Sequence, residues 1–171
     1  MKASRPTVPT SSPRHTPVVV NRTALPLAIA PRISRAKTAA SAVNHADPIA
    51  VAHAYVMVRL TYRFDDPTGY ARAVTAPAYT TAAFAARSRP DIAALTRVRT
   101  AQEVSTVKVL AVRVDGEAPN TASARYVQVS FTSTLTYRGD GSGRPQRQVW
   151  TLRLVQQLKG RWLVDGVPGT S

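Results

Sequence analysis

The spacing of apolar residues changes once along this chain, near residue 100. Before that point apolar residues recur every three to four positions, as on an amphipathic helix, and after it they alternate, as on a strand. Helices followed by strands favour an α+β fold, in which the helices pack on one face of an antiparallel sheet. The chain has 171 residues, of which 44% are hydrophobic, and this suffices for one domain with its own core.

The helical part begins at an Asp-Pro pair, which is a strong helix start. Asp47 can cap the free N–H groups of a first turn, and Pro48 needs no donor at that position. We therefore expect a helix over 49–64. Its predicted buried stripe consists of Ile49, Ala52, Val56 and Leu60.

Three shorter helices are expected after the first. Asp66 precedes a second proline and repeats the start signal, which predicts a helix over 67–76. An alanine-rich segment predicts another over 78–87, and 91–96 is expected to add one more turn.

Alternating patterns then predict four long antiparallel strands. The strands are expected over 104–114, 122–138, 146–158 and 161–167. The pattern places Trp150 and Trp162 in the core, and one face of the third strand carries Gln148, Trp150, Leu152, Leu154 and Leu158. Strands of this length twist and curl, so we expect a strongly curved sheet of about four strands, a half-open cone with helices across its mouth.

The first 44 residues differ in composition from the rest. Residues 1–46 carry seven Lys and Arg and no acid, with many Pro, Ser and Thr, so we predict a disordered basic arm over 1–44 and a folded domain over 45–168. The apolar runs 18–20 and 24–30 are too short for a spanning helix or a signal peptide. We expect a soluble chain, with peripheral attachment to the cell membrane as the alternative.

Three segments of the folded part resemble a known family. Residues 157–167 read QLKGRWLVDGV, which is similar to the closing hairpin of the nuclear-transport-factor-2-like (NTF2-like, SnoaL-like) cone superfamily. The segments 47–56 and 62–67 resemble a subgroup from actinobacterial conjugative elements and envelope-associated proteins, related to type IV secretion assembly proteins. The resemblance covers about residues 47–168. It implies a cone-shaped α+β domain that makes protein–protein interactions in conjugal transfer. Members of this subgroup usually carry a transmembrane helix before the domain.

The same superfamily contains enzymes, so the resemblance also allows a reactive site inside the cone. Such a site needs a carboxylate or histidine base inside the cone beside a polar donor. If the protein is an enzyme, the candidates are His53 as base with Tyr55 and Asp165, and His53 would need Tyr126, Gln148 or Asp165 within reach. Otherwise we expect His53 to be a half-buried boundary residue and Asp165 to pair with a neighbouring arginine.

No metal or cofactor site is expected from the sequence. The chain has no cysteine, and no His, Asp or Glu pair has ligand spacing on a predicted helix or strand. The glycine-rich segment 139–143 lacks the Lys-Ser/Thr of a phosphate-binding loop and instead predicts a hairpin turn.

We therefore expect a non-enzymatic interaction or assembly domain, an accessory component of a conjugative transfer or cell-envelope complex that binds protein partners or a second copy through the sheet. The first alternative is a small-molecule-binding or catalytic cone of the isomerase or cyclase kind. The second is a nucleic-acid-associated protein, because the net charge is +14 and the basic arm can contact an anionic surface. A single basic face would favour it, formed by Arg87, Arg89, Arg97, Arg99, Arg138, Arg144, Arg147 and Arg153.

Overall fold

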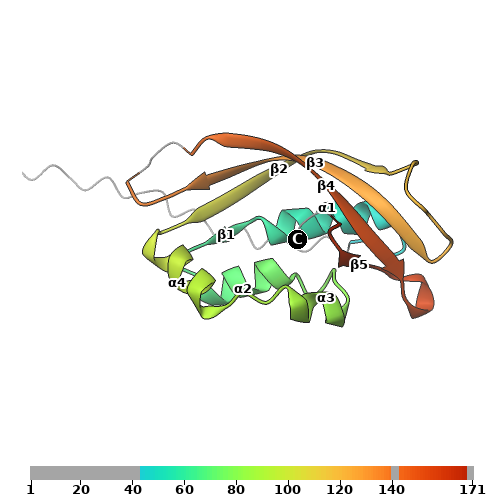
Figure 1. The fold of residues 1–171 in the computed structure, drawn as a ribbon, viewed down its shortest axis with the longest axis horizontal. Coiled ribbons are helices and arrows are strands. Elements are labelled where there is room, and N and C mark those ends of the chain that lie inside the picture. The colour runs from blue at the N-terminus through green and yellow to red at the C-terminus, as the bar shows by residue number, and fades with distance from the viewer. Residues whose placement is uncertain (1–42, 140–142, 169–171) are drawn as a thin grey trace, which may run out of the picture. The chain divides into compact units, whose positions relative to one another are not determined.

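The computed structural model describes residues 43–139 and 143–168 (Figure 1). Most of the predicted arm and the centre of the predicted 139–143 turn lie outside the described residues. The helices are α1 (Pro48–Arg59), α2 (Pro67–Thr75), α3 (Ala82–Arg87), α4 (Ile92–Thr100) and the 3-10 turn η1 (Leu158–Gly160). The strands are β1 (Tyr62–Arg63), β2 (Val104–Val114), β3 (Ala124–Thr136), β4 (Pro145–Gln156) and β5 (Trp162–Gly166).

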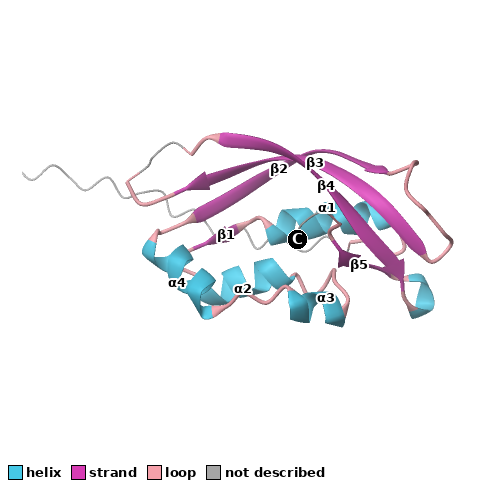
Figure 2. Ribbon diagram, viewed as in Figure 1, coloured by secondary structure: helices cyan, strands magenta, loops and turns pink. Residues whose placement is uncertain are grey.

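The strands form one antiparallel sheet in the order β1-β2-β3-β4-β5. The sheet curls over α1, and α2, α3 and α4 form a further layer on the same side (Figure 2). The register between β2 and β3 shifts between Val109 and Ala111, so Leu110 is the extra residue of a bulge. The predicted α+β cone is thus confirmed, and β1 adds a short fifth strand to the four expected.

Helix α1 begins as predicted but ends earlier. Asp47 Oδ1 accepts a hydrogen bond from the N–H of Ile49 at 2.8 Å, and the helix stops at Arg59. The predicted continuation to residue 64 is wrong, because Tyr62 and Arg63 pair with the start of β2.

The buried face of α1 also differs from the predicted stripe. Val51, Ala52, Tyr55 and Val56 are fully buried, whereas Ile49 is 38% exposed. Because α1 is apolar around most of its circumference, the sequence pattern did not select the face that meets the sheet.

The other helices begin at capping side chains. Asp66 accepts from the N–H of Gly69 at 2.7 Å, and Asp91 accepts from the N–H of Ala94 at 2.7 Å. Helix α3 starts four residues later than predicted, because Thr80 forms a bridge with Val164 of β5. Helix α4 is longer than the single turn expected and reaches Thr100.

The core lies between α1 and the concave face of β3, β4 and β5. The alternation predicted for β3 is confirmed, since Val127, Val129 and Phe131 are fully buried. Trp162 is 5% exposed, as predicted. Leu158, however, is 91% exposed, because β4 ends at Gln156 and Leu158 lies in η1.

The residues just before α1 belong to the packed structure. Val43 packs against the core, although it was assigned to the arm. The carbonyl of His45 accepts from the N–H of Trp162 at 2.8 Å, and the His45 ring stacks on Tyr79 with centroids 5.8 Å apart. The chain therefore enters the domain along β5.

Candidate functional site

The three residues predicted for an enzymatic site occupy three different environments. His53 is exposed on α1, not half-buried as predicted, because the sheet-facing side of α1 is formed by its neighbours Val51, Ala52 and Tyr55. Tyr55 is fully buried in the core cluster. Asp165 lies on β5 with its own partners. The described residues thus do not bring the three together.

Tyr55 is a core residue with an unusual hydroxyl. Its Oη is buried and has no hydrogen-bond partner among the described residues. Burial raises the pKa of Tyr55 to about 12, against a smaller lowering by the nearby Arg59. The hydroxyl therefore stays protonated at neutral pH.

Asp165 connects the sheet edge to α3. Its carboxylate accepts from the hydroxyl of Thr81 at 2.9 Å and forms an ion pair with Arg153 of β4. The predicted pairing of Asp165 with a neighbouring arginine is confirmed. Arg87 also donates to the backbone carbonyl of Asp165 at 3.3 Å, so Asp165 has a structural environment on β5.

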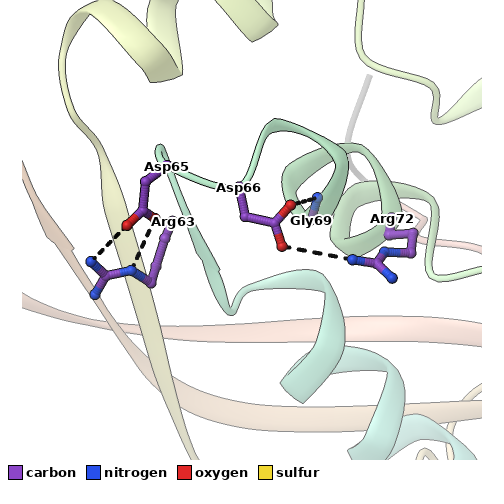
Figure 3. A network of polar contacts seen from close by, with 5 residues as sticks. All are labelled: Arg63, Asp65, Asp66, Gly69 and Arg72. Atoms are coloured by element: carbon purple, nitrogen blue, oxygen red, sulfur yellow. Dashed lines mark hydrogen bonds and ion pairs between the residues drawn. The ribbon is translucent and has the colours of Figure 1, made fainter. Parts of the chain in front are cut away.

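The acids of the β1–α2 turn are engaged in local contacts (Figure 3). Arg63 donates two hydrogen bonds of 3.1 Å to Asp65, and this guanidinium lowers the pKa of Asp65. Asp66 caps α2 and lies 3.7 Å from a guanidinium nitrogen of Arg72. A Cβ on Gly69 would lie 2.3 Å from Asp66 Oδ2, so a larger residue there would displace the Asp66 carboxylate from its capping position.

A buried polar cluster lies at the other end of the sheet, where β1 meets β2. The hydroxyl of Tyr62 donates to the carboxylate of Glu103, which is only 5% exposed. Ser105 is also buried and donates to the carbonyl of Leu60 at 2.6 Å. Burial, and then the bond to Glu103, raise the pKa of Tyr62. Sequence reasoning missed this pair, whose members are 41 residues apart.

The outer face of the sheet is not covered by any described helix. All the α-helices lie on the concave side (Figure 2). On β3 the outer face presents hydroxyls and amides, and it includes Tyr126, Gln128, Ser130, Thr132, Thr134 and Thr136. Lys108 and Arg147 flank Thr132 on the neighbouring strands, and Val149 is 58% exposed beside them.

The arginines are divided between two sides of the domain. Arg147 and Arg153 belong to the sheet, whereas Arg87, Arg97 and Arg99 belong to α3 and α4 on its helical side (Figure 1). The eight arginines considered for a nucleic-acid interface therefore do not form one patch, and nucleic-acid binding stays a prediction.

The described residues contain no group of three or more metal-ligating side chains. Within the same residues, no helix is both long and apolar enough to cross a bilayer.

No protein-family model matches the sequence, and neither does any curated protein. Two solved structures are similar in fold. One is "TraE protein in complex with 2-(2-furyl)isonicotinic acid", with 16% identity and a TM-score of 0.48 over 68% of this chain and 89% of the other. The second is "Ntf2 like protein involved in plasmid conjugation", with 12% identity and a TM-score of 0.45 over 72% of this chain and 48% of the other.

The half-open α+β cone agrees with the NTF2-like resemblance read from the closing hairpin. At these identities and TM-scores the two structures do not indicate what this chain does, so its function follows from its own surface.

Proposed function

We propose that this domain is a non-enzymatic interaction or assembly module, an accessory component of a conjugative transfer or cell-envelope complex. The observation that carries the proposal is the outer face of the sheet, which no described helix covers. A sheet face of this extent is a ready surface for a partner protein. The conjugative context rests on the sequence resemblance of the opening segments.

The chemistry of the outer face supports a protein partner. It combines exposed Val149 with a row of hydroxyls and with Lys108 and Arg147. Protein interfaces combine such apolar contacts with a polar rim.

Complex formation can be tested with a matched pair of variants. The full chain would be co-expressed with the proteins encoded by its neighbouring genes, and co-elution would be measured by gel filtration. Val149→Asp places a charge on the outer face, whereas Leu158→Asp places the same charge on an exposed residue of η1. We expect a complex that Val149→Asp disrupts and Leu158→Asp preserves. The absence of any complex, or equal behaviour of the two variants, contradicts the proposal.

The enzymatic alternative is tested separately. The full chain would be assayed with ketosteroid, polyketide-like and epoxide substrates beside His53→Ala and Asp165→Asn. We expect no turnover above buffer. Turnover that is lost in a folded variant would overturn the non-enzymatic assignment.

A further inference from the structure

One edge of the sheet is open over most of its length. Strand β1 pairs only with Val104 and Ser105, while β2 continues to Val114. Over 106–114 the outward backbone groups of β2 have no strand partner among the described residues. Such an edge presents a row of N–H and C=O groups that can pair with another strand.

The opposite edge is closed by the chain itself. Val164 of β5 donates to the carbonyl of Tyr79 at 2.8 Å, and its own carbonyl accepts from Thr81 at 2.9 Å. The openness of β2 is thus particular to that strand and is not shared by both ends of the sheet.

The core is also incomplete along the open edge. Val107, Val109 and Val112 of β2 are only partly buried where they pack against the core. Phe131 and Val129, their neighbours on β3, are fully buried. Apolar side chains from one additional strand would extend the inner layer and cover these valines.

The outer side of the same edge is positively charged. Lys108 and Arg113 are both exposed there. They pair with Thr132 and Gln128 of β3, which are four residues apart because the bulge absorbs one residue of β2. Asp115, at the end of β2, accepts from Gln128 Nε2 at 3.0 Å. A strand added in the same register would place residues four positions apart opposite the two cations.

We propose that the open edge of β2 binds an extended segment of a partner protein by strand addition. The segment carries two acidic residues four positions apart on one face and apolar residues on the other. Backbone hydrogen bonds hold the segment, while the acids opposite Lys108 and Arg113 set its register. The inference rests on the proposed interaction role and names the surface and the partner's chemistry.

A second copy of this chain fits the edge poorly. Antiparallel pairing of two β2 strands about their middle would place Lys108 of each copy opposite Arg113 of the other. Like charges directly opposite each other destabilise a strand pair. The two cations therefore oppose self-pairing and favour an acidic segment.

The probe is a blocked eight-residue peptide with glutamates at positions 2 and 6, valines at 3, 5 and 7, and threonines elsewhere. A second peptide has lysines for the glutamates, and a third has proline in place of the valine at position 5, where the N–H would face β2. Binding to the full chain would be measured by fluorescence titration at fixed salt, and amide protection by hydrogen exchange. We expect only the glutamate peptide to bind, with new protection confined to 106–114.

Two double variants with equal charge change then locate the site. Lys108→Glu with Arg113→Glu reverses the edge, and Lys159→Glu with Arg161→Glu reverses two exposed residues at the β4–β5 turn. We expect the first pair to weaken binding by at least about tenfold, as loss of two opposed charge contacts implies, and the second by less than about threefold. Melting curves would establish that both variants are folded.

Several outcomes would overturn the inference. One is that both double variants weaken peptide binding equally, and another is that the lysine or proline peptide binds as well as the glutamate peptide. The inference also fails if the new amide protection lies outside β2, or if sedimentation shows a dimer of the chain that the β2 double variant dissociates. The proline peptide retains both glutamates, so it tests the backbone pairing even if the β2 variant unfolds. If the peptide fails but the complex with neighbouring proteins still depends on Val149, the edge assignment is wrong and the interaction role stands.

Discussion

The same alternating pattern has different results on two sides of the cone, one formed by β3, β4 and β5 and the other by β2 beside the short β1. On the first side Phe131, Leu152 and Val164 are fully buried. On the second, Val109 and Val112 are partly buried and the backbone edge is open. The difference arises from neighbours. Strands β3 and β4 have a strand on each side and β5 is bordered by residues 79–81, whereas β2 has only the two residues of β1 along one side. The alternating pattern thus indicates which residues share a face of the sheet, whereas the order of the strands determines how deeply that face is buried.

Two tyrosines, one buried and one partly buried, show the same contrast in polar chemistry. Tyr55, beneath the covered side, has a hydroxyl without a partner among the described residues. Tyr62, at the β1–β2 side, donates to Glu103. Burial raises the pKa of both hydroxyls, but of the two only the Tyr62 hydroxyl forms a hydrogen bond with a buried side chain, that of Glu103.

The largest expected effect is the loss of an indole on the covered side. Trp162 is 5% exposed and packs in the core cluster, so Trp162→Ala should lower the free energy of unfolding by roughly 3–5 kcal/mol. Val109→Ala, on the open side, should cost only about 1 kcal/mol because its side chain is partly solvated. Urea unfolding followed by circular dichroism measures both. Equal losses would show that the two sides are equally packed, and an unchanged midpoint for Trp162→Ala would show that the indole is not a core group.

Alkaline pH should reveal the buried Tyr55. Its pKa in the folded chain is about 12, above the ordinary value of 10, so folding favours its protonated form. Stability is therefore unaffected below pH 10 and falls as the pH rises toward 12, by roughly 2–3 kcal/mol from this group. Unfolding free energies at pH 8, 10 and 11.5 measure the loss.

Tyr55→Phe is the matching control for that measurement. It removes a hydroxyl without a protein partner among the described residues, so its stability at pH 8 should equal or exceed that of the unchanged chain. Its alkaline loss should be smaller. The same alkaline loss in both proteins would show that Tyr55 is not the group responsible.

A smaller effect is expected at the β1–β2 side. Tyr62→Phe removes the donor to the buried Glu103, and an unsatisfied buried acceptor costs about 1–3 kcal/mol. Tyr70→Phe serves as control, because the Tyr70 ring packs edge-on against Tyr62 with centroids 4.8 Å apart and phenylalanine preserves that contact. In a double-mutant cycle with Glu103→Gln, additive losses would show that the two groups do not interact.

The sequence predicted those features that short-range chemistry determines. Asp47, Asp66 and Asp91 begin helices because a carboxylate beside the first turn satisfies free N–H groups. The limits of β2 matched the prediction, since Asp115 and Gly116 end the alternating run in a turn. These signals lie within a few residues of the feature they specify.

The features that the sequence did not predict depend on contacts between segments that are far apart in the chain. β1 is only two residues long, too short to show a period, and it exists because it pairs with Ser105. The buried face of α1 and the exposure of His53 follow from how the sheet lies on an almost wholly apolar helix. The open edge of β2 likewise follows from strand order, which the residues of β2 do not encode by themselves.

The smallest effect is expected at the amino-terminal end. Residues 1–42 combine proline with basic residues and lack periodic apolar positions, so deleting them should change the melting temperature by no more than a few degrees, equivalent to less than about 1 kcal/mol. Deleting residues 1–46 should cost more, because it removes the Val43 side chain from the core and the His45 carbonyl that accepts from Trp162. Differential scanning calorimetry of the two truncations against the full chain separates these contributions. A large loss from the shorter deletion would show that the basic segment contributes to the folded domain, whereas equal melting of both truncations would show that Val43 and His45 add nothing to β5.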